Sequence, residues 1–217
     1  MRSPWRGETA IRHVCRGRRV RWYHATVPTI VDYERVLQRM EADGFRSLYH
    51  NSGAFGFPRA ADVRYAGWIG PPDASIRSEA LEYVRHVDPP YESNLARLAG
   101  DVWTNHVPGT AWLMPMSHWS YELDLGSKEW MPAALAAIGV DATQLAGRVN
   151  GSAIAFEPGE RDALEALLMP LLANLRTSDF MLAFVGRAAL CTVHHHNQLW
   201  WQTTDAALHE VLMSVVL

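Results

Sequence analysis

Three consecutive histidines, His194, His195 and His196, lie near the end of the chain. Imidazole nitrogen is a preferred ligand of transition metals. Side chains alternate between the two faces of a strand, so on a continuous strand His194 and His196 would point the same way and His195 the opposite way. The spacing therefore predicts a site in which His194 and His196 bind a divalent transition metal, with a further ligand from elsewhere in the chain.

A second polar segment, residues 118–125, alternates between polar and apolar or aromatic side chains, which predicts a strand with one polar face. That face would carry His118, Glu122 and Asp124, and any of them could supply the further metal ligand. His118 and Glu122 also form a candidate catalytic pair, because imidazole and carboxyl groups are the usual general acids and bases.

Both patterns have an alternative explanation. One face of an antiparallel sheet commonly lies in water, and this alone produces an alternation of polar and apolar residues. If the chain turns at His196 and Asn197, then His194 and His196 no longer share a strand face. Solvated or structurally hydrogen-bonded histidines therefore remain an open alternative.

Tryptophan is abundant, with nine residues in the chain. Each indole offers a large apolar face and one N–H donor, so the indoles can form the wall of a ligand pocket or fill the core. The candidate ligand-binding residues are aromatic or imidazole side chains near predicted strands: Trp112, Trp119, Tyr121, His50 and Trp200. The sequence contains no Gly-x-Gly-x-x-Gly, Walker or Gly-x-Ser-x-Gly pattern, so it predicts neither nucleotide-dependent chemistry nor serine hydrolysis.

Charge is distributed unevenly along the chain. Seven of the 20 basic residues but one of the 23 acidic residues precede position 22, which leaves a formal charge of −9 in the remainder. A body of this charge argues against nucleic acid as a partner. We expect residues 1–19 to form a loosely ordered basic arm, because chain ends are often loose.

Hydrophobic residues make up 48% of the chain and charged residues 20%, which is typical of a globular protein. No apolar run approaches the length of about 20 residues that a membrane span needs. Two cysteines, Cys15 and Cys191, are too few for a disulfide framework. They favour a reduced compartment, and we therefore expect a cytoplasmic protein.

The hydrophobic periodicity predicts an α+β fold, in which a mixed or antiparallel sheet has its helices packed on one side. The predicted strands cover residues 20–27, 45–50, 54–57, 63–69, 111–116, 118–125, 152–157, 180–185, 188–195 and 198–204. The predicted helices begin near residues 29, 75, 95, 127, 161 and 205. We expect one domain over residues 20–217, with 20–110 and 111–217 as its two halves.

Each half contains the order strand, helix, strand, strand, over residues 20–69 and 152–204, so the halves could be pseudo-related βαββ units. This order resembles that of the tandem βαββ ligand-binding domains attached to some bacterial multidrug-response regulators. The resemblance lies in the element order alone, and no functional residue is carried over from it.

Three functions fit the sequence. A ligand-binding module would hold a small molecule in a pocket lined by tryptophan and histidine. A metal-dependent or acid–base enzyme would use the histidines with His118 or Glu122. A module that binds a protein partner would use the acidic body. The sequence predicts neither the ligand nor the oligomeric state.

Overall fold

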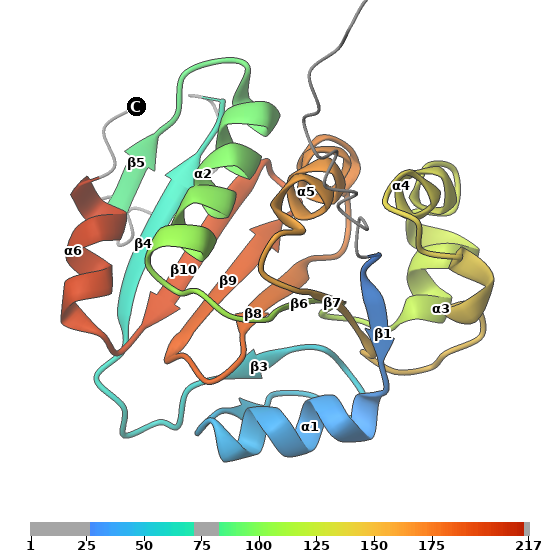
Figure 1. Ribbon diagram of the computed structural model, residues 1–217, viewed down its shortest axis with the longest axis horizontal. Helices are drawn as coiled ribbons and strands as arrows, with labels where there is room; N and C mark the ends of the chain where they lie inside the picture. Colours follow the sequence, from blue (N-terminus) through green and yellow to red (C-terminus); the bar gives the residue numbers. More distant parts are fainter. Residues whose placement is uncertain (1–26, 72–82, 215–217) are drawn as a thin grey trace, which may run out of the picture.

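The computed structural model describes residues 27–71 and 83–214, and its centre is a sheet of eight strands (Figure 1). The strands follow the order β1-β7-β6-β8-β9-β10-β4-β5. Their bounds are Thr29–Val31 (β1), Arg64–Ile69 (β4), Val84–His86 (β5), Ala111–Pro115 (β6), Ala153–Phe156 (β7), Phe180–Phe184 (β8), Ala189–His194 (β9) and Gln198–Thr203 (β10). β4 and β5 are parallel, and the other neighbouring pairs are antiparallel. The predicted α+β class with a mixed, mostly antiparallel sheet is confirmed.

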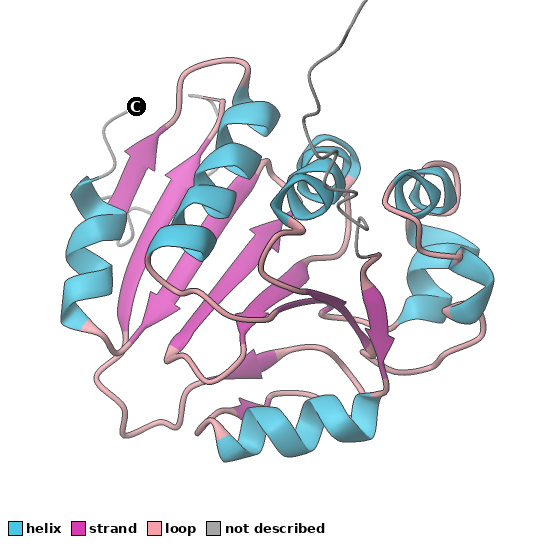
Figure 2. Ribbon diagram, in the orientation of Figure 1, coloured by secondary structure: helices cyan, strands magenta, loops and turns pink. Residues whose placement is uncertain are grey.

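Helices cover both faces of the sheet. The longer ones are Tyr33–Ala42 (α1), Tyr91–Asn105 (α2), Met131–Ala137 (α4), Arg161–Asn174 (α5) and Ala206–Ser214 (α6). Helices α2, α4, α5 and α6 contribute to the larger core, so the predicted packing of helices on one side of the sheet holds for these four helices but not for α1. Helix α1 packs on the opposite face, together with the two-stranded sheet of β2 (Arg46–Ser47) and β3 (Phe55–Gly56) (Figure 2).

Strand β6 shows how the sequence builds these two cores. Ala111 and Leu113 belong to the larger core, whereas Trp112 and Met114 belong to the smaller core beneath α1. Successive side chains of a strand point to opposite faces, so a strand that is covered on both faces must be apolar throughout. All five residues of β6 are buried.

The corresponding elements of the two predicted halves occupy different positions in the fold. The order β1, α1, β2, β3 in the first half matches β7, α5, β8, β9 in the second. However, β2 and β3 form a separate sheet, whereas β8 and β9 lie near the centre of the large one. Helices α1 and α5 belong to different cores on opposite faces. In the large sheet the strands of the second half, β6 to β10, are contiguous, and strands of the first half flank them, β1 on one side and β4 and β5 on the other. The division at residue 110 stays a prediction.

The strand predicted over residues 118–125 is wrong, because this segment is helical. It forms a short turn of α-helix, Trp119–Tyr121 (α3), followed by a π-helix, Glu122–Gly126 (η2). The His118 ring accepts a hydrogen bond from the backbone N–H of Tyr121, and this cap starts the helix. No sheet edge is available next to β6, since β7 and β8 already pair with it.

Glu122 stabilises this helical segment from within. Its side chain is fully buried, and its two carboxyl oxygens accept hydrogen bonds from the hydroxyls of Ser117, at 2.7 Å, and Ser127, at 2.9 Å. Such local side-chain bonds compete with sheet pairing and favour turns and helix ends. The alternation of polar residues therefore reflects bonds inside the segment, not a solvated strand face.

Two further predicted elements, a helix from residue 75 and a strand over residues 20–27, differ from the structure where it describes them. Val84–His86 was expected to end a helix that begins near residue 75, but it forms β5, which pairs in parallel with β4. The rest of that helix, residues 75–82, lies outside the described residues. Of the strand predicted over residues 20–27, the structure describes Val27, which precedes β1 and belongs to no strand.

Two turns that the sequence marks with Asn, Gly and Ser lie against each other. The backbone N–H of Gly151 donates to the carbonyl of Asn51 at 2.8 Å, and that of Gly53 donates to Pro115 at 3.0 Å. A Cβ atom on Gly151 would lie 2.1 Å from the backbone nitrogen of Gly53, so no larger residue fits this crossing. The crossing holds the segment after β6 in place.

Among the described residues, no helix combines the length and the apolar character that crossing a membrane requires.

We predict that Glu122→Ala lowers the free energy of unfolding by about 2–4 kcal/mol, because it leaves the buried Ser127 hydroxyl and the half-buried Ser117 hydroxyl without their acceptor. Asp124→Ala is the matched control, since Asp124 is exposed and lies in the same π-helix, and it should change the stability by less than about 0.5 kcal/mol. Chemical denaturation measures both values. Equal effects of the two substitutions would contradict the structural role of Glu122.

Candidate functional site: a histidine turn beside a polar hollow

The three histidines form the turn between β9 and β10. His194 ends β9 and pairs with Gln198 at the start of β10, so His195, His196 and Asn197 make a three-residue connection. Asn197 has a φ of 59°, the left-handed conformation that such a connection requires at its last residue. We refer to residues 194–197 as the histidine turn.

Neighbouring elements hold the histidine turn in place. The Asn197 side chain donates to the Glu92 carboxylate of α2 at 2.6 Å. The Asn197 carbonyl accepts the backbone N–H of Gly70, the residue after β4, at 3.2 Å. These bonds place the turn between a helix and the sheet, and they fix the backbone that carries the imidazoles.

The three imidazoles gather on one side of the turn. Their ring centroids lie 4.3 Å apart for His194 and His195, 4.2 Å for His195 and His196, and 4.9 Å for His194 and His196. One nitrogen from each ring can be chosen so that all lie within 4.8 Å of one another. The turn therefore brings together not only the predicted ligands His194 and His196 but also His195.

Asp179 orients His195. Its Oδ1 accepts a hydrogen bond from the His195 backbone N–H at 3.0 Å and lies 2.8 Å from the His195 ring Nδ1. A carboxylate in this position holds the proton on Nδ1, so the lone pair of Nε2 is free to bind a metal or accept a proton. Asp179 directly precedes β8, and its backbone carbonyl accepts the N–H of Met116 at 2.9 Å.

The side chain of His194 is partly buried, like that of His195, whereas His196 is exposed. Burial lowers the pKa of His194, the nearby Asp179 carboxylate raises it, and the positive charge that His195 and His196 can carry lowers it further, with a net pKa below the ordinary value of 6.5. The ring is therefore neutral near pH 7, as a metal ligand must be. Its Nδ1 accepts the backbone N–H of His196 at 3.2 Å.

A hollow with a volume of about 340 Å³ lies beside the histidine turn. We call it the polar hollow, and its lining comes from the segment after β6, the segment before β8 and the turn: Met116, Ser117, His118, Tyr121, Thr177, Ser178, Asp179 and His195. The hollow brings His118 and Tyr121, two of the residues predicted from the sequence, next to His195 and Asp179.

Hydrogen bonds also fix the two predicted residues in the hollow. The Nδ1 atom of His118 accepts the Tyr121 N–H at 3.2 Å and lies 3.0 Å from the Ser120 hydroxyl. The proton of the neutral ring is thereby placed on Nε2, which is a potential donor. The Tyr121 hydroxyl lies 3.1 Å from that of Thr177. Glu122 is not among the residues that line the hollow, and its buried carboxylate accepts hydrogen bonds from Ser117 and Ser127.

The predicted tryptophans do not share one pocket. Trp119 is fully buried, and its indole N–H donates to the carbonyl of Ser152 at 2.6 Å. Trp200 lies over Gly67 on the sheet, where a Cβ atom on the glycine would be 2.7 Å from the indole ring. His50 is exposed in the loop between β2 and β3. Trp112 lines a different cavity, beneath α1.

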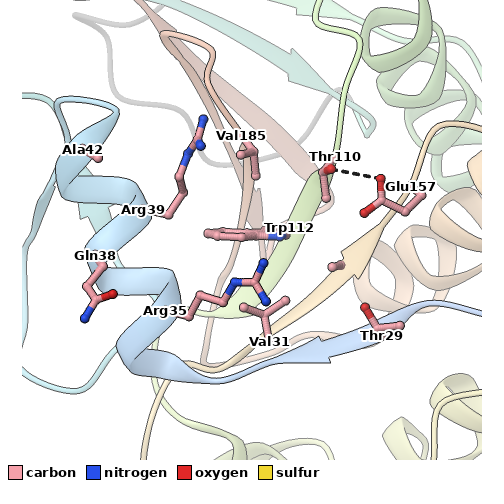
Figure 3. A pocket seen from close by; sticks show the side chains of 11 residues that line it. Thr29, Val31, Arg35, Gln38, Arg39, Ala42, Thr110, Trp112, Glu157 and Val185 are labelled. Atoms are coloured by element: carbon pink, nitrogen blue, oxygen red, sulfur yellow. Dashed lines mark hydrogen bonds between the residues drawn. The ribbon is translucent and has the colours of Figure 1, made fainter.

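This other cavity, which we call the α1 pocket, has a volume of about 470 Å³ and lies between α1 and strands β1, β6 and β7 (Figure 3). Arg35, Gln38 and Arg39 of α1 line one side of it. Thr110 and Glu157 line the other side, and the Thr110 hydroxyl donates to the Glu157 carboxylate at 3.0 Å. The α1 pocket and the polar hollow lie at opposite ends of β6 and β8.

No protein-family model matches this chain, and neither the curated proteins nor the solved structures contain a significant match to it. The function must therefore be inferred from the chemistry of the site.

We predict that protonation of His194 destabilises the fold. The pKa of His194 is lowered in the folded chain, so its neutral form is favoured by folding. The stabilising contribution is present above the unfolded pKa, near 6.5, and is lost as the pH falls through the folded pKa. Thermal unfolding in the presence of a chelator, at about pH 7.5 and about pH 5, should show a larger loss of Tm for the wild type than for His194→Asn. Equal losses would contradict the prediction.

Proposed function

We propose that this chain binds a divalent transition metal at the histidine turn, and that the polar hollow beside the turn receives a small polar ligand or substrate. The single observation that supports the proposal most strongly is the 2.8 Å contact between Asp179 and the His195 ring. Metal-binding histidines almost always donate their second ring N–H to a carboxylate, a backbone carbonyl or a water, which fixes the ring and strengthens the ligand.

The three imidazoles fit a metal after a small rearrangement. Nitrogen ligands at 2.0–2.1 Å in a tetrahedral site lie about 3.3 Å apart, so the present separations of up to 4.8 Å must shorten by about 1–1.5 Å. Side-chain rotation can supply a change of this size. The ring of His196 is exposed and makes no hydrogen bond with any described residue, so it is free to move.

To bind a metal, His194 must give up a hydrogen bond or change its tautomer. Its Nδ1 accepts the His196 backbone N–H, so the proton of the neutral ring lies on Nε2. Binding through Nδ1 would displace that N–H, and binding through Nε2 would require the proton to move to Nδ1. Of the three rings, His195 is prepared best for a metal, and His194 requires the largest change.

The ligand set favours borderline metals such as Zn²⁺, Ni²⁺ and Cu²⁺ over Mg²⁺ and Ca²⁺, because imidazole nitrogen suits the former and oxygen suits the latter. Three protein ligands leave a fourth position open, as in catalytic zinc sites. His118 and the hydroxyls of the polar hollow would then contact a ligand in that position.

A metal-free acid–base function is the second candidate, because His195 and Asp179 form a dyad that faces the same hollow as His118. The free Nε2 of His195 can accept a proton, and the Nε2–H of His118 can donate one. This candidate uses His195 with Asp179 beside His118, and the pair of His118 and Glu122 stays a prediction. We also propose a cytoplasmic location, because a chain with two cysteines fits a reduced compartment.

We predict that the untagged protein binds one Zn²⁺ per chain in a saturable manner, measured by isothermal titration calorimetry. His195→Asn keeps a donor toward Asp179 but removes Nε2, and it should weaken zinc binding by at least about tenfold. Asp179→Asn should weaken binding by about 10–100-fold, because it alters the carboxylate behind the ligand.

The matched control is His106→Ala, which removes an exposed histidine at the end of α2. It should leave zinc binding unchanged. Zinc binding that is absent, or that His195→Asn leaves intact, would overturn the metal site. If zinc does not bind but His195 reacts with diethyl pyrocarbonate much faster than His106, the acid–base function is favoured instead.

A further inference from the structure

The α1 pocket holds a cationic side chain that no described residue neutralises through an ion pair. The guanidinium of Arg35 makes no hydrogen bond or ion pair with any of the described residues, although Arg35 lines a cavity of about 470 Å³. The second arginine, Arg39, is paired: its Nε lies 2.9 Å from the Asp43 carboxylate, which also accepts the Gly186 N–H at 2.7 Å. The charge available to a ligand on the α1 side is therefore that of Arg35.

Trp112 supplies an aromatic surface in the same pocket. The residue is 5% exposed and belongs to the smaller core, so its ring is held in place by packing. Its indole N–H has no hydrogen-bond partner among the described residues, in contrast to the N–H groups of Trp119 and Trp103. A rigid indole in a pocket wall favours flat ligands.

The opposite side of the α1 pocket is acidic. Glu157 is exposed, forms no ion pair with a described residue and accepts the Thr110 hydroxyl. Figure 3 shows the arginines arising from α1 on one side of Trp112, and Thr110 with Glu157 on the other. A simple anion would be attracted by Arg35 but repelled by Glu157, so charge complementarity requires a ligand with an anionic end and a hydrogen-bond-donating end.

We propose that the α1 pocket binds a small planar aromatic carboxylate that carries an amino group at its far end. The carboxylate contacts Arg35, the ring lies against Trp112, and the amino group donates to Glu157. The cavity volume lies within the range of small-molecule sites, about 300–1,000 Å³. This site does not depend on the histidine turn, because it lies at the other end of β6 and β8.

The test uses three related probes, 4-aminobenzoate, benzoate and 4-aminobenzamide, in NMR titrations of the full chain. We expect saturable binding of 4-aminobenzoate, with benzoate weaker by about threefold to tenfold because it lacks the donor, and 4-aminobenzamide weaker by about tenfold because it lacks the charge. Arg35→Ala should remove the advantage of the carboxylate probes. Glu157→Gln should remove the preference for 4-aminobenzoate over benzoate.

Arg59→Ala is the matched control, since Arg59 is exposed, makes no ion pair with a described residue and lies outside the pocket. It should leave all three affinities unchanged. The proposal is overturned if none of the probes binds, if the amide binds as tightly as the carboxylates, or if Arg35→Ala has no more effect than Arg59→Ala. If the protein binds 4-aminobenzoate but not zinc, the metal site at the histidine turn is overturned and the ligand site in the α1 pocket is supported.

Discussion

The hydrogen bonds between Asp179 and His195 join two parts of the chain on which the site depends. Through its carboxylate, Asp179 holds both the backbone and the ring of His195, at 3.0 and 2.8 Å. Through its carbonyl, Asp179 also holds Met116, at the beginning of the segment that carries His118. One residue therefore connects the end of β6, the start of β8 and the histidine turn. Without it, the His195 ring would have no partner that fixes its tautomer.

The sheet order explains why two candidate sites coexist. β8 lies between β6 and β9, so one end of this group faces the histidine turn and the other faces α1. The polar hollow forms where β6 ends and β8 begins, and the α1 pocket forms where β6 begins and β8 ends. Ligand sites in sheet proteins commonly lie at strand ends, because the loops there carry polar side chains while the strands remain buried. A rigid, apolar β6 separates the two sites.

Much of the fold could be predicted from periodicity, since β6, β7 and β8 are apolar throughout and α5 has leucines at helical spacing. Even Asp179 could have been found from the sequence: a hairpin that turns at Gly186 and Arg187 pairs Phe180 with Val193, which places Asp179 beside the first histidines. The π-helix could not be predicted, because the polar alternation of residues 118–125 looks the same whether the side chains face water or one another. Nor could it be predicted that the Arg35 guanidinium forms no ion pair with a described residue, because this depends on the arrangement of side chains in space and not on their spacing in the sequence.

The tautomer of His195 tests the account most directly. Long-range ¹H–¹⁵N correlation spectra of the metal-free protein should show His195 protonated at Nδ1, with Nε2 free, and addition of Zn²⁺ should shift the Nε2 resonance while the proton stays on Nδ1. A His195 ring protonated at Nε2, or an Nε2 resonance that does not respond to zinc, would contradict the role assigned to Asp179 and to the histidine turn.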